Sequence, residues 1–145
     1  MSEFDDFLTR TLARQVMAEE AIDNGDPAPQ MEMWSTRDPV TLFGVWGPCN
    51  SGSDEVSRTF RWVASRFSNC TASSFDHVAA GVRGDLAYTV GYERSSVSVD
   101  GCPVEPETLR VTHVYRRENG EWTIVHRHGD HLPIDQSPPA ESSTS

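Results

Sequence analysis

Three histidines, an aspartate and an arginine lie within ten residues near the C-terminal end, in Trp122-Thr-Ile-Val-His-Arg-His-Gly-Asp-His131. Side chains of a β-strand alternate between its two faces, so His126 and His128 are expected on the same side. Neutral imidazoles are suitable zinc ligands, and two at this spacing can chelate one metal ion. The segment therefore offers a possible metal chemistry, which the rest of the chain has to support.

The string His126-x-His128-x-Asp130-His131 is similar to the zinc motif of the metallo-β-lactamase superfamily. Those enzymes place the motif in the first half of a longer fold and need further His and Asp ligands downstream. Here only residues 132–145 follow, and none of them is a histidine. A zinc-dependent hydrolase acting through His126 and His128 is therefore a remote alternative. We expect no metal and no other cofactor.

Length and charge limit the classes of partner. A chain of 145 residues with 37% hydrophobic content fits one ordinary domain. The formal net charge of -10 at pH 7 argues against nucleic acid or an anionic membrane as a partner, because both require a basic face. No apolar run approaches bilayer length and the N-terminus lacks a signal-peptide pattern, so a cytoplasmic protein is expected.

Two helices are predicted in the first half. Apolar residues recur at helical spacing from about Glu3 to Asn24, and Gly25 follows as a stop signal. Ser53 is expected to be the N-cap of a second amphipathic helix that continues to about Phe67. Between them, residues 40–46 are β-branched and aromatic, as is typical of a short strand.

After Cys70 the sequence is typical of strands separated by turn pairs at Gly84-Asp85, Asp100-Gly101 and Asn119-Gly120. Consecutive strands with short turns predict an antiparallel meander. The fold class expected is α+β, with N-terminal helices packed on a strongly bent antiparallel sheet in residues 1–134. The tail, residues 135–145, has no apolar anchor and is expected to be disordered. The four strands are predicted at about 74–83, 85–99, 109–117 and 121–128.

The last two predicted strands carry a family resemblance. Leu109-Arg-Val-Thr-His-Val-Tyr-Arg-Arg-Glu-Asn-Gly-Glu-Trp-Thr-Ile-Val-His-Arg-His128 resembles the final hairpin of SnoaL-like proteins of the nuclear transport factor 2-like superfamily. It is similar in particular to the association domain of calcium/calmodulin-dependent kinases, in which Trp-x-x-Val-His-x-His recurs after an (Asp/Asn)-Gly turn. The resemblance covers residues 3–133. It implies a ketosteroid isomerase-like, cystatin-like cone with a pocket between sheet and helices, and a homodimer formed through the outer face of the sheet.

The same resemblance guides the choice of site residues. The general base of ketosteroid isomerases falls on Phe43 here, so that chemistry lacks its carboxylate. The pocket arginine of the kinase association domain corresponds to His113, which becomes the best candidate for a polar or catalytic group. The full set of pocket candidates is His113, Tyr92, Tyr115, Arg127, Trp46, Tyr88, His126 and His128.

These residues do not settle a function. The first hypothesis is a pocket for a small, largely apolar molecule, with acid–base chemistry of the isomerase, cyclase or dehydratase type. The alternative is a non-catalytic dimerisation or hub module. Whether the protein is an enzyme stays open.

Overall fold

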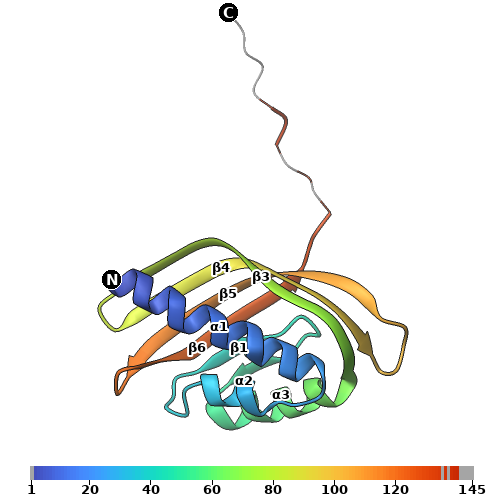
Figure 1. The fold of residues 1–145 in the computed structure, drawn as a ribbon, viewed down its shortest axis with the longest axis horizontal. Helices are drawn as coiled ribbons and strands as arrows, with labels where there is room; N and C mark the ends of the chain where they lie inside the picture. The colour runs from blue at the N-terminus through green and yellow to red at the C-terminus, as the bar shows by residue number, and fades with distance from the viewer. Residues whose placement is uncertain (1, 135, 137, 141–145) are drawn as a thin grey trace, which may run out of the picture.

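A six-stranded mixed sheet arches over three helices (Figure 1). The computed structural model describes residues 2–134, 136 and 138–140. The helices are α1 (Glu3–Asp23), α2 (Ala28–Met33) and α3 (Ser53–Arg66). The strands are β1 (Thr41–Phe43), β2 (Cys49–Ser51), β3 (Phe67–Arg83), β4 (Leu86–Val99), β5 (Glu105–Glu118) and β6 (Glu121–His131). The predicted disorder of residues 135–145 falls mostly outside the described residues.

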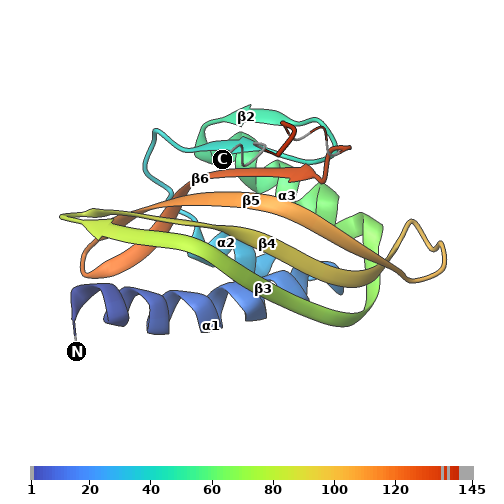
Figure 2. The same ribbon diagram turned by 90° about the horizontal axis from the view of Figure 1, so that it is seen from above.

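The strand order is β2-β1-β6-β5-β4-β3, and the sheet is not closed. The predicted meander β3 to β6 is confirmed, each strand antiparallel to the next. The sheet as a whole is mixed, because β1 pairs parallel with β6. Strand β2 was not expected, and β3 begins at Phe67, several residues earlier than predicted. In Figure 2, α1 runs along the β3 side while α3 lies toward β2.

The core lies between the concave face of the sheet and the helices. Phe7 of α1 packs edge-on against Tyr115 and Trp122, with ring centroids 5.1 and 5.2 Å away. Trp34 and Phe60 make a similar contact at 5.2 Å between the α2 end and α3. Such aromatic pairs add packing energy to the burial of apolar surface and fix the helices against the sheet.

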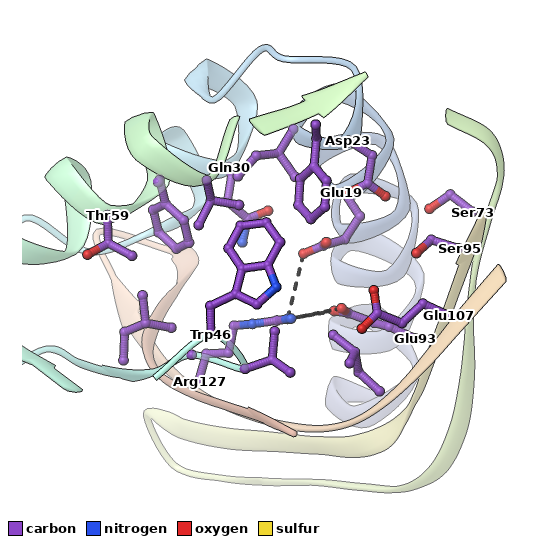
Figure 3. A pocket seen from close by; sticks show the side chains of 18 of the residues that line it. Glu19, Asp23, Gln30, Trp46, Thr59, Ser73, Glu93, Ser95, Glu107 and Arg127 are labelled. Atoms are coloured by element: carbon purple, nitrogen blue, oxygen red, sulfur yellow. Dashed lines mark hydrogen bonds and ion pairs between the residues drawn. The ribbon is translucent and has the colours of Figure 1, made fainter. Parts of the chain in front are cut away.

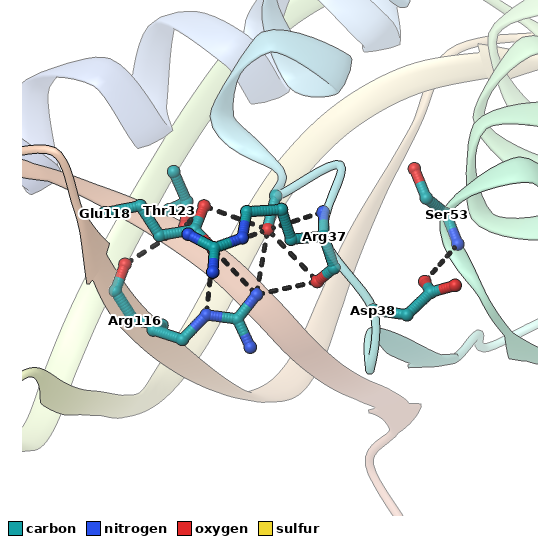
Figure 4. Close-up of polar contacts among 7 residues, drawn as sticks. Arg37, Asp38, Ser53, Arg116, Glu118 and Thr123 are labelled. Atoms are coloured by element: carbon teal, nitrogen blue, oxygen red, sulfur yellow. Dashed lines mark hydrogen bonds and ion pairs between the residues drawn. The ribbon is translucent and has the colours of Figure 1, made fainter.

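Polar contacts determine how α3 and the last hairpin are held (Figure 4). The helix begins at Ser53, but the N-cap position belongs to Gly52, so the predicted serine cap is wrong. Instead, the Asp38 carboxylate accepts a hydrogen bond from the Ser53 backbone N–H at 3.0 Å, satisfying one free donor of the first turn. Glu118 accepts bonds from Arg116, Ser35 and Thr123 and so joins the hairpin to the α2 end.

A β-bulge in β6 determines which residues reach the core. Tyr115 pairs with Ile124 and Val114 with His126, so Val125 is an extra residue in the ladder. Ile124 is fully buried on the concave face, and after the bulge that face is continued by Arg127. The bulge therefore turns His126 and His128 to the outer face.

Candidate functional site

A pocket opens between the concave face of the sheet and all three helices (Figure 3). Its cavity volume, measured as the space open to the centres of water-sized molecules, is about 100 Å³. Aromatic and aliphatic side chains form most of its wall, including Trp46, Phe60, Trp62 and Leu109. A mostly apolar cavity with a few polar groups is the usual form of a small-molecule site.

The polar end of the pocket is built around Arg127. Its guanidinium donates two hydrogen bonds to the Glu93 carboxylate, at 2.6 Å and 2.8 Å, in a bidentate pair. Glu19 of α1 lies 3.6 Å from Nη1, the arginine nitrogen that makes the 2.6 Å bond to Glu93. Although burial opposes its charge, Glu93 and then Glu19 raise the pKa of Arg127, which stays protonated. Its donors are thus turned toward protein carboxylates.

Asp23, at the end of α1, differs from Glu93 because no salt bridge joins it to a cation within the described residues, whereas Glu93 pairs with Arg127. The residue is 5% exposed and lines the pocket. Among the described residues, the one side-chain hydrogen bond to its carboxylate is a long contact from the Cys70 thiol, at 4.0 Å. Burial, and then the charge of Glu93, raise the pKa of Asp23 to about 7. This carboxyl can therefore exchange a proton near neutral pH.

Glu19 is perturbed in the same direction. Burial, followed by repulsion from Glu93, raises the pKa of Glu19 well above its ordinary value, although Arg127 opposes this. Glu19 and Asp23 are one helical turn apart on α1, so both carboxyls face the pocket. The pocket end thus holds two carboxyls that share the nearby charge of one arginine.

Behind Arg127 a buried polar chain continues under α1. His113 is fully buried, with its Nε2 3.2 Å from Arg127 and its Nδ1 3.2 Å from the Gln15 amide. The Tyr115 hydroxyl donates to the Gln15 amide oxygen at 3.0 Å. Burial, and then the charge of Arg127, lower the pKa of His113 well below its ordinary value. Burial and the adjacent guanidinium both disfavour the imidazolium, and the neutral ring can accept from only one of the two flanking N–H groups.

The predicted site residues are divided between the two faces of the sheet. Trp46 and Arg127 line the pocket. His113 and Tyr115 are buried on the same concave face but behind the pocket wall. Tyr92 and His128 line a shallow groove on the outer face, together with Val78. Tyr88 and His126 also belong to the outer face, by the alternation along β4 and the bulge in β6.

The histidines of the terminal motif have local partners on that outer face. Thr41 Oγ1 lies 2.7 Å from His126 Nδ1, and Asp130 lies 2.6 Å from His128 Nε2. Phe43 stands where the resemblance to ketosteroid isomerases would place the general base. Its ring packs edge-on against both imidazoles, with ring centroids 5.6 Å from His126 and 5.4 Å from His128. Within the described part of the chain, no three His, Cys, Asp or Glu side chains are grouped to hold a metal ion.

Among the polar residues of the pocket that sequence reasoning missed are Glu19, Asp23, Gln30 and Glu93. Three of them come from helices, in segments that resemble solvent-facing polar turns. A signal was present for α1, whose buried positions include Phe7, Thr11, Gln15, Ala18 and Ile22. Glutamine and threonine thus occupy a helical stripe between buried apolar residues. Such a stripe indicates a polar site under the helix.

No described helix is both long and apolar enough to cross a membrane. Comparison with curated proteins gave no match.

Many solved structures have the same fold. A proposed dehydratase of the nuclear transport factor 2-like family from Streptomyces avermitilis is 20% identical, with a TM-score of 0.69, covering 90% of this chain and 99% of that one. A proposed calcium/calmodulin-dependent protein kinase II association domain from Xanthomonas campestris is 13% identical, with a TM-score of 0.67, covering 90% and 87%.

An uncharacterised protein with a cystatin-like fold from Caulobacter vibrioides is 15% identical, with a TM-score of 0.67 and 92% of both chains covered. At such identities these likenesses show the fold alone. The family model of the SnoaL-like domain matches residues 14–134, which include the polar end of the pocket and the final hairpin. The chain belongs to the SnoaL-like domain family.

Proposed function

We propose that this SnoaL-like protein binds a small, largely apolar molecule in the pocket and transfers protons to or from it through Asp23. The observation that carries the proposal is a carboxyl that is 5% exposed, lines an aromatic pocket and has no strong donor among the described residues. A general acid or base works best when its pKa lies near the working pH, and that of Asp23 is about 7.

Glu19 is the second member of the acid–base pair. Its carboxyl lies beside Arg127, whereas Asp23 stands closer to the Cys70 thiol. Two carboxyls in different surroundings release their protons at different pH values, which allows one to donate while the other accepts. Isomerisation, cyclisation and dehydration can each use such a pair. The Streptomyces avermitilis neighbour, a proposed dehydratase, agrees with this class of chemistry.

Binding is tested with N-phenyl-1-naphthylamine, a neutral apolar dye whose fluorescence rises when it leaves water. We expect saturable binding to the wild-type protein. Val63 lines the pocket, so Val63→Trp should fill part of it and weaken binding about tenfold or more. Val104→Trp is the matched control, because Val104 is exposed and lies outside the pocket lining. Equal binding by both variants would contradict the proposed site.

Proton exchange is tested by carbon-13 NMR of the aspartate carboxyls. One resonance should titrate near pH 7 and disappear in Asp23→Asn. If every aspartate titrates below about pH 5, near the ordinary aspartate range, Asp23 cannot serve as the acid or base.

A second candidate function is assembly through the outer face of the sheet. Val78, Leu86 and Tyr88 are exposed apolar residues there, and Phe43 extends the surface at β1. A homodimer would cover them, as would a hub partner. Sedimentation of the wild type should give a dimer mass that Tyr88→Glu reduces to a monomer. A monomeric wild type at micromolar concentration would remove this candidate.

A further inference from the structure

A buried amide at the polar end of the pocket lacks a partner. Gln30 is 2% exposed and lines the pocket, and its side-chain oxygen accepts no hydrogen bond within the described structure. A buried acceptor without a donor costs free energy, and a bound molecule can supply what is missing. Figure 3 places this amide at the same end of the pocket as Glu19 and Asp23. Three side chains therefore present acceptor oxygens to one region.

The two arginines on the pocket lining are already engaged. Arg127 gives its two closest bonds to Glu93 and faces Glu19 with the same guanidinium. Arg94, also on the pocket lining, pairs with Asp76 at 2.6 Å outside it. The charged groups facing the pocket are the four carboxyls Glu19, Asp23, Glu93 and Glu107 and the guanidinium of Arg127. Carboxyls are in excess, so an anionic ligand group would meet repulsion.

The chemistry of a matching ligand follows from these contacts. It needs several N–H donors and a positive charge at one end, and an apolar body for the wall around Trp46 and Leu109. A primary ammonium carries three donors and no acceptor, which corresponds to the three acceptor side chains. Resting on the proposed binding pocket, we infer that its ligand is an apolar primary amine, whose ammonium is held by Asp23, Glu19 and the Gln30 oxygen.

Binding of such a cation is coupled to protons. The ammonium stabilises the ionised carboxylates, so Asp23 releases a proton when it binds near neutral pH, and the raised pKa of Glu19 acts in the same direction. Amine affinity should therefore increase as the pH rises from 6 to 8, while the amine itself stays protonated. The Cys70 thiol beside Asp23 also faces this carboxyl, and burial raises its pKa, so it stays uncharged over this range.

The test uses three probes with one apolar body: 2-(1-naphthyl)ethylamine, 2-(1-naphthyl)ethanol and 1-naphthaleneacetic acid. Calorimetry at pH 7 should show the amine binding about tenfold or more tighter than the alcohol, and the acid weakest, because a charge-assisted bond is worth more than a neutral one. Titration in buffers of different ionisation enthalpy should show proton release for the amine alone.

Two variants test whether Asp23 and Gln30 cause the preference for the amine over the alcohol. Asp23→Asn should bring the amine and alcohol affinities together, and Gln30→Leu should weaken amine binding while leaving the alcohol less affected. Asp54→Asn, an exposed acid outside the pocket lining, is the control and should keep the full preference. Circular dichroism confirms that each variant is folded.

The outcomes separate this inference from the proposed function. If the neutral dye binds but the three probes bind equally, or the acid binds best, the amine inference is overturned and the apolar pocket stands. If the dye binds and none of the probes does, the amine inference also fails. If the dye and all probes fail to bind, the proposed function fails together with it.

Discussion

Arg127 and its neighbours His126 and His128 lie side by side in β6 but on opposite faces of the sheet. The arginine side chain is buried among Glu93, Glu19 and His113 at the polar end of the pocket. The two histidines contact Thr41, Asp130 and the exposed Phe43 on the outer face. The sequence motif draws attention to the histidines, yet the fully buried ionisable groups surround the arginine.

The difference follows from solvation. On the outer face water solvates a charge, so ion pairs there contribute little free energy. In the pocket the same kinds of group lose water, and each charge depends on its partners. Burial is what raises the pKa of Asp23 to about 7 and lowers that of His113. The pocket face therefore holds buried carboxyls whose pKa values are raised by desolvation.

The largest expected effect comes from removing the buried cation. Arg127→Met leaves Glu93 and Glu19 without their partner and should lower the free energy of unfolding by about 3–5 kcal/mol. Arg94→Met breaks an exposed pair with Asp76 and should cost about 0–1 kcal/mol. Urea denaturation at pH 7 measures both. Equal losses of unfolding free energy in the two variants would mean that burial does not make the Arg127 ion pairs more important for stability than the exposed pair.

A smaller effect is expected along the polar chain behind Arg127. His113→Ala opens a buried cavity and leaves the Gln15 amide without one partner, which should cost about 2–4 kcal/mol. His128→Ala removes a half-exposed imidazole paired with Asp130 and should cost less than about 1 kcal/mol. The same urea measurement applies. If His113→Ala keeps the wild-type free energy of unfolding, the polar chain of hydrogen bonds behind Arg127 does not stabilise the core.

The sequence predicted the fold well because its signals are local. Turn pairs such as Asn119-Gly120 and alternating strands determine the meander without knowledge of distant contacts. The bulge at Val125 is different, since strict alternation places Ile124 and His126 on one face. Only pairing with β5 shows that the faces exchange after Ile124, which brings Arg127 into the pocket.

The helical part of the site was hidden for a second reason. Gln30 and Asp23 become pocket residues through the packing of α1 and α2 under the sheet, over long sequence separations. Asp and Glu residues in helices usually lie on exposed faces, so the residue type alone does not predict that such a carboxylate is buried. The polar residues Thr11 and Gln15 on the buried stripe of α1 are the one local signal.

The pH dependence of stability distinguishes the two faces further. The pKa of Asp23 is raised from 3.8 to about 7 on folding, so the folded state binds the extra proton. The stability this gives is complete below about pH 4 and is lost as the pH rises through 7. Compared with wild type, Asp23→Asn should therefore gain about 4 kcal/mol between pH 4 and 8.

Asp54→Asn, on the exposed first turn of α3, serves as the control and should follow the wild-type curve. Urea titrations at four pH values measure the differences. If Asp23→Asn runs parallel to wild type from pH 4 to pH 8, the carboxyl is not desolvated in solution.

The smallest effect is expected for zinc on the outer face. His126 and His128 already contact Thr41 and Asp130, and the described residues offer no grouped set of three ligands. A site that binds only the folded state raises the melting temperature as ligand is added. Micromolar zinc should thus change Tm alike, within about 1 °C, in wild type and in the His126→Ala/His128→Ala double variant. Stoichiometric zinc in the purified wild type, lost in the double variant, would return the chemistry to the histidine face. The comparison between the two faces of β6 would then be reversed, because the outer face would hold a reactive centre beside exposed histidines.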